Sequence, residues 1–203
     1  MPRPREFDRD DALNKAMAVF WLKGYAATST TDLLGAMQIG RQSMYDTFGD
    51  KHALYLEALR HYCQQSIAEL LDSLQGARGL NGVANMLSTF ASRPEQDHAK
   101  GCMGVNAICE FGDRDAEVLA ARDASSALLN QALEHALHEA AAAGQMPADA
   151  HIADAVAFIQ ATLAGMKISA KAGSDCATLH AIARFAISAL SKENREPARF
   201  SLI

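Results

Sequence analysis

Residues 28–51 constrain what this chain can fold into more than any other stretch, because they predict two short helices joined by one tight turn. Ser29 and Asp32 have the spacing of a capping box, in which a hydroxyl and a carboxylate satisfy the first unpaired N–H groups of a helix. That helix would begin at Thr30 and end before Gly40, where its apolar pattern stops. A helix–turn–helix of this length is a compact way to place a second helix in the major groove of DNA.

The second short helix has an apolar side and a polar side. Met44, Tyr45 and Phe48 lie at positions i, i+1 and i+4 and predict the apolar side. The polar residues that are left for solvent or for a binding partner are Arg41, Gln42, Ser43 and Asp46. The sequence therefore predicts a DNA-reading face on this helix.

The rest of the chain also predicts helices, and we find no β-pattern and no internal repeat. Apolar residues recur at helical spacing in long segments over residues 8–23, 52–75, 115–144, 149–171 and 175–191. The last two segments are rich in alanine, and small residues let helices approach closely, which favours a helix–helix interface. We expect an all-α protein, with a three-helix DNA-binding domain over residues 1–51 and a larger helical domain over residues 52–203.

The composition is that of a globular protein of 203 residues, with 49% apolar residues and a net charge of −5. The sequence shows no signal peptide and no apolar run near the roughly 18 residues that suggest a membrane span, so we expect a cytoplasmic protein without a membrane partner. Residues 1–51 carry seven basic and seven acidic side chains. Because these charges cancel, we expect weak non-specific DNA binding and reliance on the placement of individual side chains.

The N-terminal residues 1–7 allow two interpretations. They form either a frayed terminus, which we favour, or an arm whose Arg3 and Arg5 reach a minor groove or a phosphate.

The cysteines and histidines do not predict a metal site. The four cysteines, at positions 63, 102, 109 and 176, form no Cys-x-x-Cys pair, and the seven histidines have no spacing typical of metal ligands. Cys102 follows Gly101 at a predicted helix start beside Lys100, where a thiol pKa can be lowered. A redox or electrophile sensor is therefore one interpretation of Cys102, and a small buried apolar residue is the interpretation we favour.

The stretch from Gly24 to Lys51 resembles the DNA-binding domain of the TetR family of bacterial transcriptional regulators. The residues that carry this resemblance are Gly24-Tyr25, Thr28-Ser29-Thr30, Asp32-Leu33, Ile39, Ser43-Met44-Tyr45, Phe48 and Gly49-Asp50-Lys51. The chain departs from the family pattern at Gln38, where a turn glycine is usual, at Gly40, where a serine often caps the next helix, and at Asp46-Thr47, where an aromatic or histidine pair is common.

The resemblance implies which side chains contact DNA. Arg41 and Gln42 would face base edges, where arginine suits guanine and glutamine suits adenine. Thr30 and Thr31 would contact phosphate or bases at a helix N-terminus. The residues expected to hold the DNA backbone are Ser43, Tyr45, Thr47 and Lys51. For Tyr45 a second interpretation stays open, in which its ring is buried and only its hydroxyl reaches the surface.

The resemblance also implies a homodimer through residues 149–191, a palindromic double-stranded operator, and a small-molecule effector that most often releases a repressor from DNA. Asn106 and Glu110 lie four apart on an otherwise apolar predicted helix, so they need either internal partners or a polar ligand. The residues expected to line a pocket for a mainly apolar or aromatic effector are Met86, Phe90, Met103, Asn106, Ala107, Glu110, Phe111, Phe158, Thr162 and Met166. A plain hydrophobic core is the alternative for this set.

An enzyme and a non-DNA-binding helical adaptor are the competing classes of function. Glu110 could act as a general base beside Asn106, but the chain has no glycine-rich phosphate loop and no nucleophile elbow. We therefore expect a regulator that is not an enzyme and that needs no cofactor.

Overall fold

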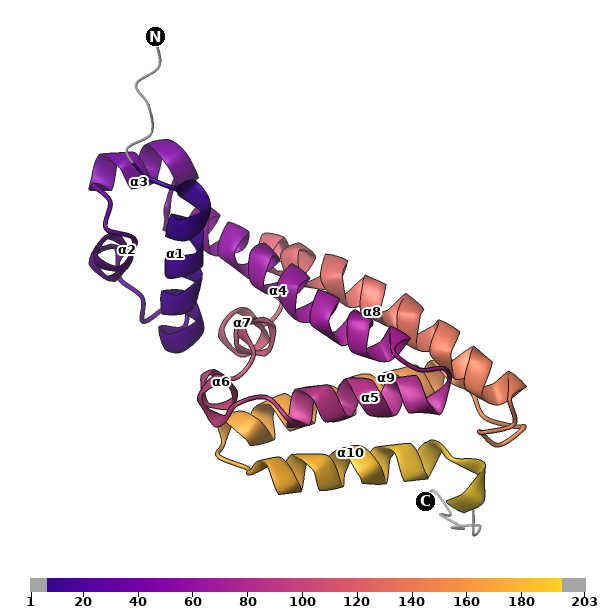
Figure 1. Ribbon diagram of the computed structural model, residues 1–203. Coiled ribbons are helices and arrows are strands. Elements are labelled where there is room, and N and C mark those ends of the chain that lie inside the picture. Colours follow the sequence, from indigo (N-terminus) through magenta and orange to yellow (C-terminus); the bar gives the residue numbers. More distant parts are fainter. Residues whose placement is uncertain (1–6, 195–203) are drawn as a thin grey trace. The chain divides into compact units, whose positions relative to one another are not determined.

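The computed structural model describes residues 7–194, which are helical and contain no strand (Figure 1). Arg3 and Arg5, the residues of the possible DNA arm, lie outside the described residues. The helices are α1 (Arg9–Lys23), α2 (Thr30–Met37), α3 (Arg41–Phe48), α4 (Lys51–Gln75), α5 (Leu80–Ala91), α6 (Glu95–Lys100), α7 (Met103–Phe111), α8 (Ala116–Ala142), α9 (Ile152–Lys171) and α10 (Cys176–Leu190), followed by a short 3-10 turn. The predicted all-α fold is confirmed.

The chain forms two compact units, each with its own core. Of the described residues, the first unit contains 7–66 and 100–126, and the second contains 67–99 and 127–194. The predicted boundary between residues 51 and 52 differs from this division, because the compact units divide the long helices α4 and α8 rather than the connection between α3 and α4. The first half of α4 packs on the three N-terminal helices, so contact alone groups it with them.

The first unit is built around the three N-terminal helices, to which we refer as the head (residues 7–51). Asp8 begins α1, because its side chain accepts hydrogen bonds from the backbone N–H groups of Asp10 and Asp11. Gly24 ends α1 with a φ of 79° and a ψ of 172°, a backbone conformation that residues other than glycine rarely adopt. The core that joins the head to α4 and α7 includes Phe20, Leu33, Met44, Tyr55, Leu59 and Met103, all essentially inaccessible to solvent.

In the second unit α10 packs against both α5 and α9, and Figure 1 shows these three helices running side by side. Their buried apolar faces include Met86, Ile159 and Leu179. Gln145 fixes the start of α5 by accepting a hydrogen bond from the backbone N–H of Leu80 at 2.9 Å. Residues 149–191, the predicted dimer segment, therefore form one well-packed helix pair.

Helix α9 is the one described helix that is long and apolar enough to cross a membrane by length and composition. Its residues Ala155, Ile159, Leu163 and Met166 are buried in the core of the second unit. Packing in this core accounts for these four apolar residues.

Candidate nucleic-acid interface and effector region

The start of α2 has the capping box that the sequence predicts. The hydroxyl oxygen of Ser29 accepts a hydrogen bond from the backbone N–H of Asp32 at 3.1 Å, and the Asp32 carboxylate accepts one from the backbone N–H of Ser29 at 2.9 Å. Lys23 donates a further hydrogen bond to this carboxylate at 2.7 Å. The Lys23 ammonium, followed by the hydrogen bonds from Ser29, holds the pKa of Asp32 well below its usual range. Both ends of the connection from α1 to α2 are thereby fixed.

The turn between α2 and α3 passes through a left-handed residue, although a glutamine stands where a glycine is usual. Gln38 adopts the left-handed conformation, with φ 56° and ψ 40°, and among residues 7–194 it is the one non-glycine residue with a positive φ. Gly40 occupies the N-cap position of α3 in the extended conformation usual there, and because glycine has no side chain, α3 begins without a side-chain cap. The turn is therefore formed at some cost in backbone strain at Gln38.

Helix α3 presents a polar face to solvent. Met44 and Phe48 are buried in the core of the first unit, whereas Arg41 and Gln42 are exposed. Tyr45 is 42% exposed, which favours the surface interpretation of this ring over the buried one. The side of α3 that faces away from the core is thus the side on which the sequence places the base-reading residues.

The eight predicted DNA-contacting residues all lie on the head or at the first residue of α4. Thr31, Arg41, Gln42 and Tyr45 are exposed, and Thr30, Ser43, Thr47 and Lys51 are half-buried. The ammonium of Lys51 lies 4.3 Å from the centre of the Tyr25 ring, which holds this cation at the start of α4.

Most cations of the head are already paired within the first unit. Arg9 pairs with Glu57 at 2.6 Å, Lys15 with Asp11 at 2.7 Å, and Lys23 with Asp32. Among the basic side chains of residues 7–51, Arg41 alone has no ion pair or ring contact in the described structure. Among the described basic side chains of the head, Arg41 is therefore the one that is exposed on α3 without such a partner.

The segment 100–115 is tied to the head at two places and to α4 at a third, all within the first unit. The indole N–H of Trp21 donates to the carbonyl of Gly101 at 2.9 Å, and His52 contacts the carboxylate of Asp115 at 2.7 Å. Between them, the carboxylate of Glu110 accepts hydrogen bonds from the backbone N–H groups of Tyr25 at 2.9 Å and Ala26 at 3.0 Å. These N–H groups belong to the connection that leads into α2.

Of the two possibilities that the sequence left for Glu110, internal partners or a polar ligand, the structure shows internal partners. A Cβ atom on Gly24 would lie 2.2 Å from a Glu110 carboxylate oxygen, so the absence of a side chain at Gly24 makes room for this contact. Sequence reasoning placed Glu110 in an effector pocket and missed its contact with the head. No local pattern indicates a contact between residues 85 positions apart.

The other predicted effector-lining residues fall in both units. Met103, Asn106, Ala107 and Phe111 belong with Glu110 to the first unit, and Met86, Phe90, Phe158, Thr162 and Met166 belong to the second. Within the first unit Met103 and Ala107 are core residues, and the Phe111 ring stacks on Tyr55 with ring centres 5.5 Å apart. Within the second unit Met86, Phe90 and Met166 are buried in the core, whereas Phe158 is 40% exposed. These positions favour packing roles for the buried members.

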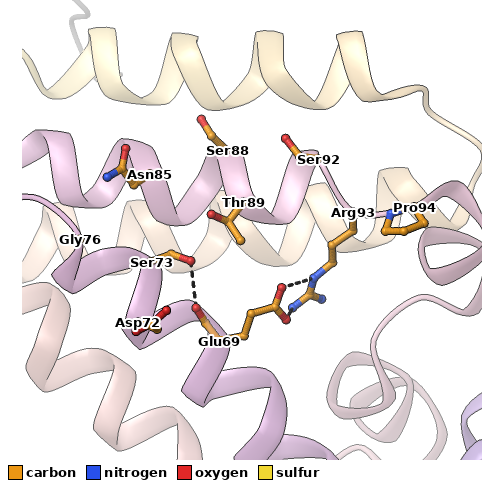
Figure 2. A pocket seen from close by; sticks show the side chains of 10 residues that line it. All are labelled: Glu69, Asp72, Ser73, Gly76, Asn85, Ser88, Thr89, Ser92, Arg93 and Pro94. Atoms are coloured by element: carbon orange, nitrogen blue, oxygen red, sulfur yellow. Dashed lines mark hydrogen bonds and ion pairs between the residues drawn. The ribbon is translucent and has the colours of Figure 1, made fainter.

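A polar groove in the second unit is not anticipated by the sequence analysis. It has a volume of about 710 Å³ and lies between the second half of α4 and α5. Figure 2 shows Arg93 reaching toward Glu69, with which it forms an ion pair. The groove shares no residue with the predicted apolar lining; it is lined by Glu69, Asp72, Ser73, Gly76, Asn85, Ser88, Thr89, Ser92, Arg93 and Pro94. Hydroxyl and amide side chains at helical spacing on α5 were the signal that could have revealed it.

A smaller pocket of about 280 Å³ lies where the connection from α8 to α9 meets the end of α10. Phe158 lines it, and so do His151 and Asp154. Phe158 is the one predicted effector residue that lines either of these two pockets, and a single residue is too little to define an effector site.

Cys102 immediately precedes α7 and is buried in the core of the first unit. A Cβ atom on Gly104 would lie 3.7 Å from the sulfur of Cys63 and 3.8 Å from the sulfur of Cys102, so both sulfurs face the same point. Cys109 is exposed on the same helix. The described residues contain no group of three or more histidine, cysteine, aspartate or glutamate residues placed to hold a metal ion.

The fold and the exposed face of α3 define a helix–turn–helix protein with a helical C-terminal part. Comparison with known proteins identifies the family: residues 12–58 match "Bacterial regulatory proteins, tetR family", and residues 76–186 match "Tetracyclin repressor-like, C-terminal domain". The chain belongs to the TetR family of bacterial transcriptional regulators. This family is not enzymatic, which agrees with the sequence-based prediction and removes the enzyme alternative.

Three relatives illustrate the match. The HTH-type transcriptional repressor ComR of Escherichia coli is 28% identical over 184 residues, which cover 89% of this chain and 88% of ComR. The uncharacterised regulator YezE of Bacillus subtilis is 31% identical over 148 residues, which cover 72% of this chain and 76% of YezE. A cysteine-substituted form of the TetR-family regulator CifR, solved in complex with a 26-base-pair operator, is 34% identical with a TM-score of 0.78 over 93% of this chain and 99% of CifR.

Proposed function

We propose that this protein is a ligand-responsive transcriptional repressor that binds a palindromic operator as a homodimer and leaves it when a small, mainly apolar effector binds. The observation that carries the proposal is the exposed face of α3, where Arg41 has no ion pair among residues 7–194 and Gln42 and Tyr45 point away from the core. The operator complex of the similar regulator CifR and the repressor names of relatives support it. We place the protein in the cytoplasm, where bacterial DNA is found.

In this proposal eight residues of the head contact DNA, and they fall into groups with different roles. Arg41 and Gln42 read base edges, and each good bidentate contact discriminates against a wrong base by about 1–3 kcal/mol. Thr30 and Thr31 contact phosphate or bases, and Ser43, Tyr45, Thr47 and Lys51 bind the DNA backbone. Because most other cations of the head are paired internally, we expect a shallow salt dependence for each head and an affinity that depends on two heads acting together.

The homodimer is proposed to form through residues 149–191. Large apolar side chains are exposed on both helices of this segment, with Phe158 40% and Ile168 55% exposed on α9 and Phe185 77% exposed on α10. Exposed aromatic residues on adjacent helices are typical of a protein–protein interface. A two-fold interface would also match the symmetry of a palindromic operator.

Effector control is proposed to pass through α7. Its residues Met103 and Ala107 pack in the first unit, and its Glu110 holds the connection that leads into α2. A ligand that prefers the conformation in which this connection is displaced would lower operator affinity, since only a difference in affinity between two states can shift them. The mainly apolar character of the effector rests on the predicted lining, and the polar groove of Figure 2 offers hydrogen-bonding groups as well.

The test is selection of bound sites from random double-stranded DNA with the full chain, followed by mobility shifts at two salt concentrations. We expect enrichment of an inverted repeat and a loss of its preference when Arg41 is replaced by alanine. Failure to enrich any sequence would overturn the proposal. A screen of small molecules for release of the selected operator would then identify the effector class.

A thiol-based regulator is the second candidate, favoured by the two sulfurs that face Gly104. A peroxide would oxidise the thiols of Cys63 and Cys102 to a disulfide while it is itself reduced to water. Both residues are only 7% exposed, which limits access and leaves packing as the preferred role. If operator binding by a Cys102→Ser variant responds to peroxide in the same way as that of the wild type, this candidate is eliminated.

A further inference from the structure

Helix α3 contains a hydrogen bond between two exposed side chains that lie on its reading face. The amide nitrogen of Gln42 donates to a carboxylate oxygen of Asp46 at 2.7 Å, across one helical turn. A carboxylate can only accept hydrogen bonds, so the orientation of the Gln42 amide is defined, with its nitrogen toward Asp46. The amide plane of Gln42 is thereby fixed before DNA arrives.

The remaining polar groups of Gln42 match one base. With one N–H engaged by Asp46, the amide retains its oxygen as an acceptor and its second N–H as a donor. Adenine offers the complementary pair in the major groove, an acceptor at N7 and a donor at N6, whereas guanine offers two acceptors. We propose that Asp46 is a positioning residue that holds the amide of Gln42 for adenine, an inference that rests on the proposed operator binding.

A contribution to the stability of α3 does not explain why position 46 carries an aspartate. An exposed pair one turn apart adds only about 0.2–0.5 kcal/mol to helix stability. Asp46 has no cationic partner among the described residues, and its negative charge on a DNA-facing helix opposes phosphate binding. A residue that weakens general DNA affinity in this way is consistent with a gain in specificity, because pre-orienting a side chain reduces the entropy lost when it binds its base.

The charge and the positioning role of Asp46 predict different effects of substitution. Loss of the charge raises the affinity for DNA in general, and loss of the positioning lowers the preference for adenine. Removal of the charge strengthens binding to DNA of unrelated sequence, whether Asp46 is replaced by asparagine or by alanine. Only the alanine variant also releases the Gln42 amide, because an asparagine side-chain oxygen still accepts a hydrogen bond. Sequence preference for adenine should therefore fall in Asp46→Ala and persist in Asp46→Asn.

The experiment uses the full chain and the operator obtained by selection. Each A·T pair of one half-site is replaced by G·C, and the ratio of dissociation constants is measured for the wild type and for Gln42→Ala, Asp46→Ala, Asp46→Asn and the double alanine variant. The position where Gln42→Ala loses discrimination is the one that Gln42 contacts. Thermal unfolding of each variant verifies that α3 stays folded, which we expect because both side chains are exposed.

At that position we expect the wild type to prefer adenine by about 5- to 150-fold. Asp46→Ala should reduce the ratio at least threefold, Asp46→Asn should keep it within twofold, and Asp46→Ala should have no further effect once Gln42 is alanine. If Asp46→Ala keeps the wild-type ratio while Gln42→Ala loses it, the positioning role is wrong and the proposed function stands. If Gln42→Ala changes the ratio at no position, the base-reading role of Gln42 fails and the inference fails with it.

Discussion

The carboxylate of Glu110 on α7 binds the backbone N–H groups of Tyr25 and Ala26 in the connection that leads into α2. The contact joins residues 85 and 84 positions apart, and Gly24 leaves the space that it occupies. A carboxylate that accepts two backbone hydrogen bonds is a stronger link than an ordinary surface contact, because the acceptor is charged. Within the first unit, this link ties the connection between α1 and α2 to α7.

Replacement of Glu110 by alanine should weaken both the fold and DNA binding. Two backbone N–H groups would lose a charged acceptor in a half-buried place, which water can partly replace, so we expect the free energy of unfolding to fall by about 1–2 kcal/mol. We also expect operator affinity to fall, because α2 supports α3 through the turn at Gln38. Urea unfolding and mobility shifts measure the two effects.

Asp113 supplies the matched control for this prediction. It is an exposed acidic residue shortly after α7, and the described structure gives its side chain no partner. Asp113→Ala removes the same charge without the Glu110 contacts and should leave stability within about 0.5 kcal/mol of the wild type. Equal losses in the two variants would show that charge alone, not the contact with Tyr25, accounts for the effect.

A side chain at Gly24 should disrupt the same contact from its other side. In Gly24→Ala the Cβ atom would lie 2.2 Å from a Glu110 oxygen, and the backbone conformation of φ 79° and ψ 172° is strained for alanine, so we expect a loss of about 1–3 kcal/mol. Gly35 lies inside α2 with open space around it, so Gly35→Ala should instead stabilise the protein by about 0.5–1 kcal/mol. Chemical denaturation of both variants checks the opposite signs.

The elements of the head could be predicted because their signals are local. The capping box of Ser29 and Asp32 needs partners only three residues apart, and the structure confirms it. The apolar side of α3 follows from helical spacing, so Met44 and Phe48 were placed correctly. Gln38 shows the limit of such reasoning, since it adopts a left-handed conformation that residues other than glycine do not favour.

The role of Glu110 could not be predicted, because its partners are backbone N–H groups of a distant segment and backbone groups leave no trace in the sequence. The sequence pattern could identify only that a carboxylate on an apolar helix needs partners. The predicted effector lining has a related weakness. Methionine and phenylalanine at helical spacing do not distinguish a core from a cavity, and Met86 and Met166 are buried in the core.

Acid should destabilise the protein through carboxylates that are bound in the folded state. Hydrogen bonds from Lys23 and Ser29 lower the pKa of Asp32, those from Val118 and His52 lower that of Asp115, and those from Thr178 lower that of Asp175, each from the ordinary value of 3.8. A lowered folded-state pKa adds stability above the ordinary value, and this stability is lost as the pH falls further. We therefore expect the melting temperature to fall between about pH 5 and pH 2.

The contribution of Asp32 can be isolated with one substitution. Asp32→Asn removes the charged partner of Lys23, so it should lower the melting temperature at neutral pH and make the acid-induced fall less steep. Asp113→Asn provides the control, because it removes a carboxylate that the described structure leaves without a partner. An unchanged pH dependence in Asp32→Asn would contradict the assignment of this acid sensitivity to the start of α2.

The exposed ring of Phe185 provides the sharpest test of the proposed dimer. With 77% of the residue exposed on α10, Phe185→Asp should leave the monomer folded, as judged by circular dichroism. A two-fold interface buries the ring twice, at about 1.5–3 kcal/mol each, so the substitution should raise the dimer dissociation constant by about 100-fold or more. Sedimentation should then show the 21.8 kDa monomer in place of a species of twice that mass, and operator affinity should fall with it.

Leu22 supplies the control, because it is 71% exposed on α1, outside residues 149–191. Leu22→Asp should therefore leave the dimer intact. An equal effect of both substitutions would argue against an interface on α10.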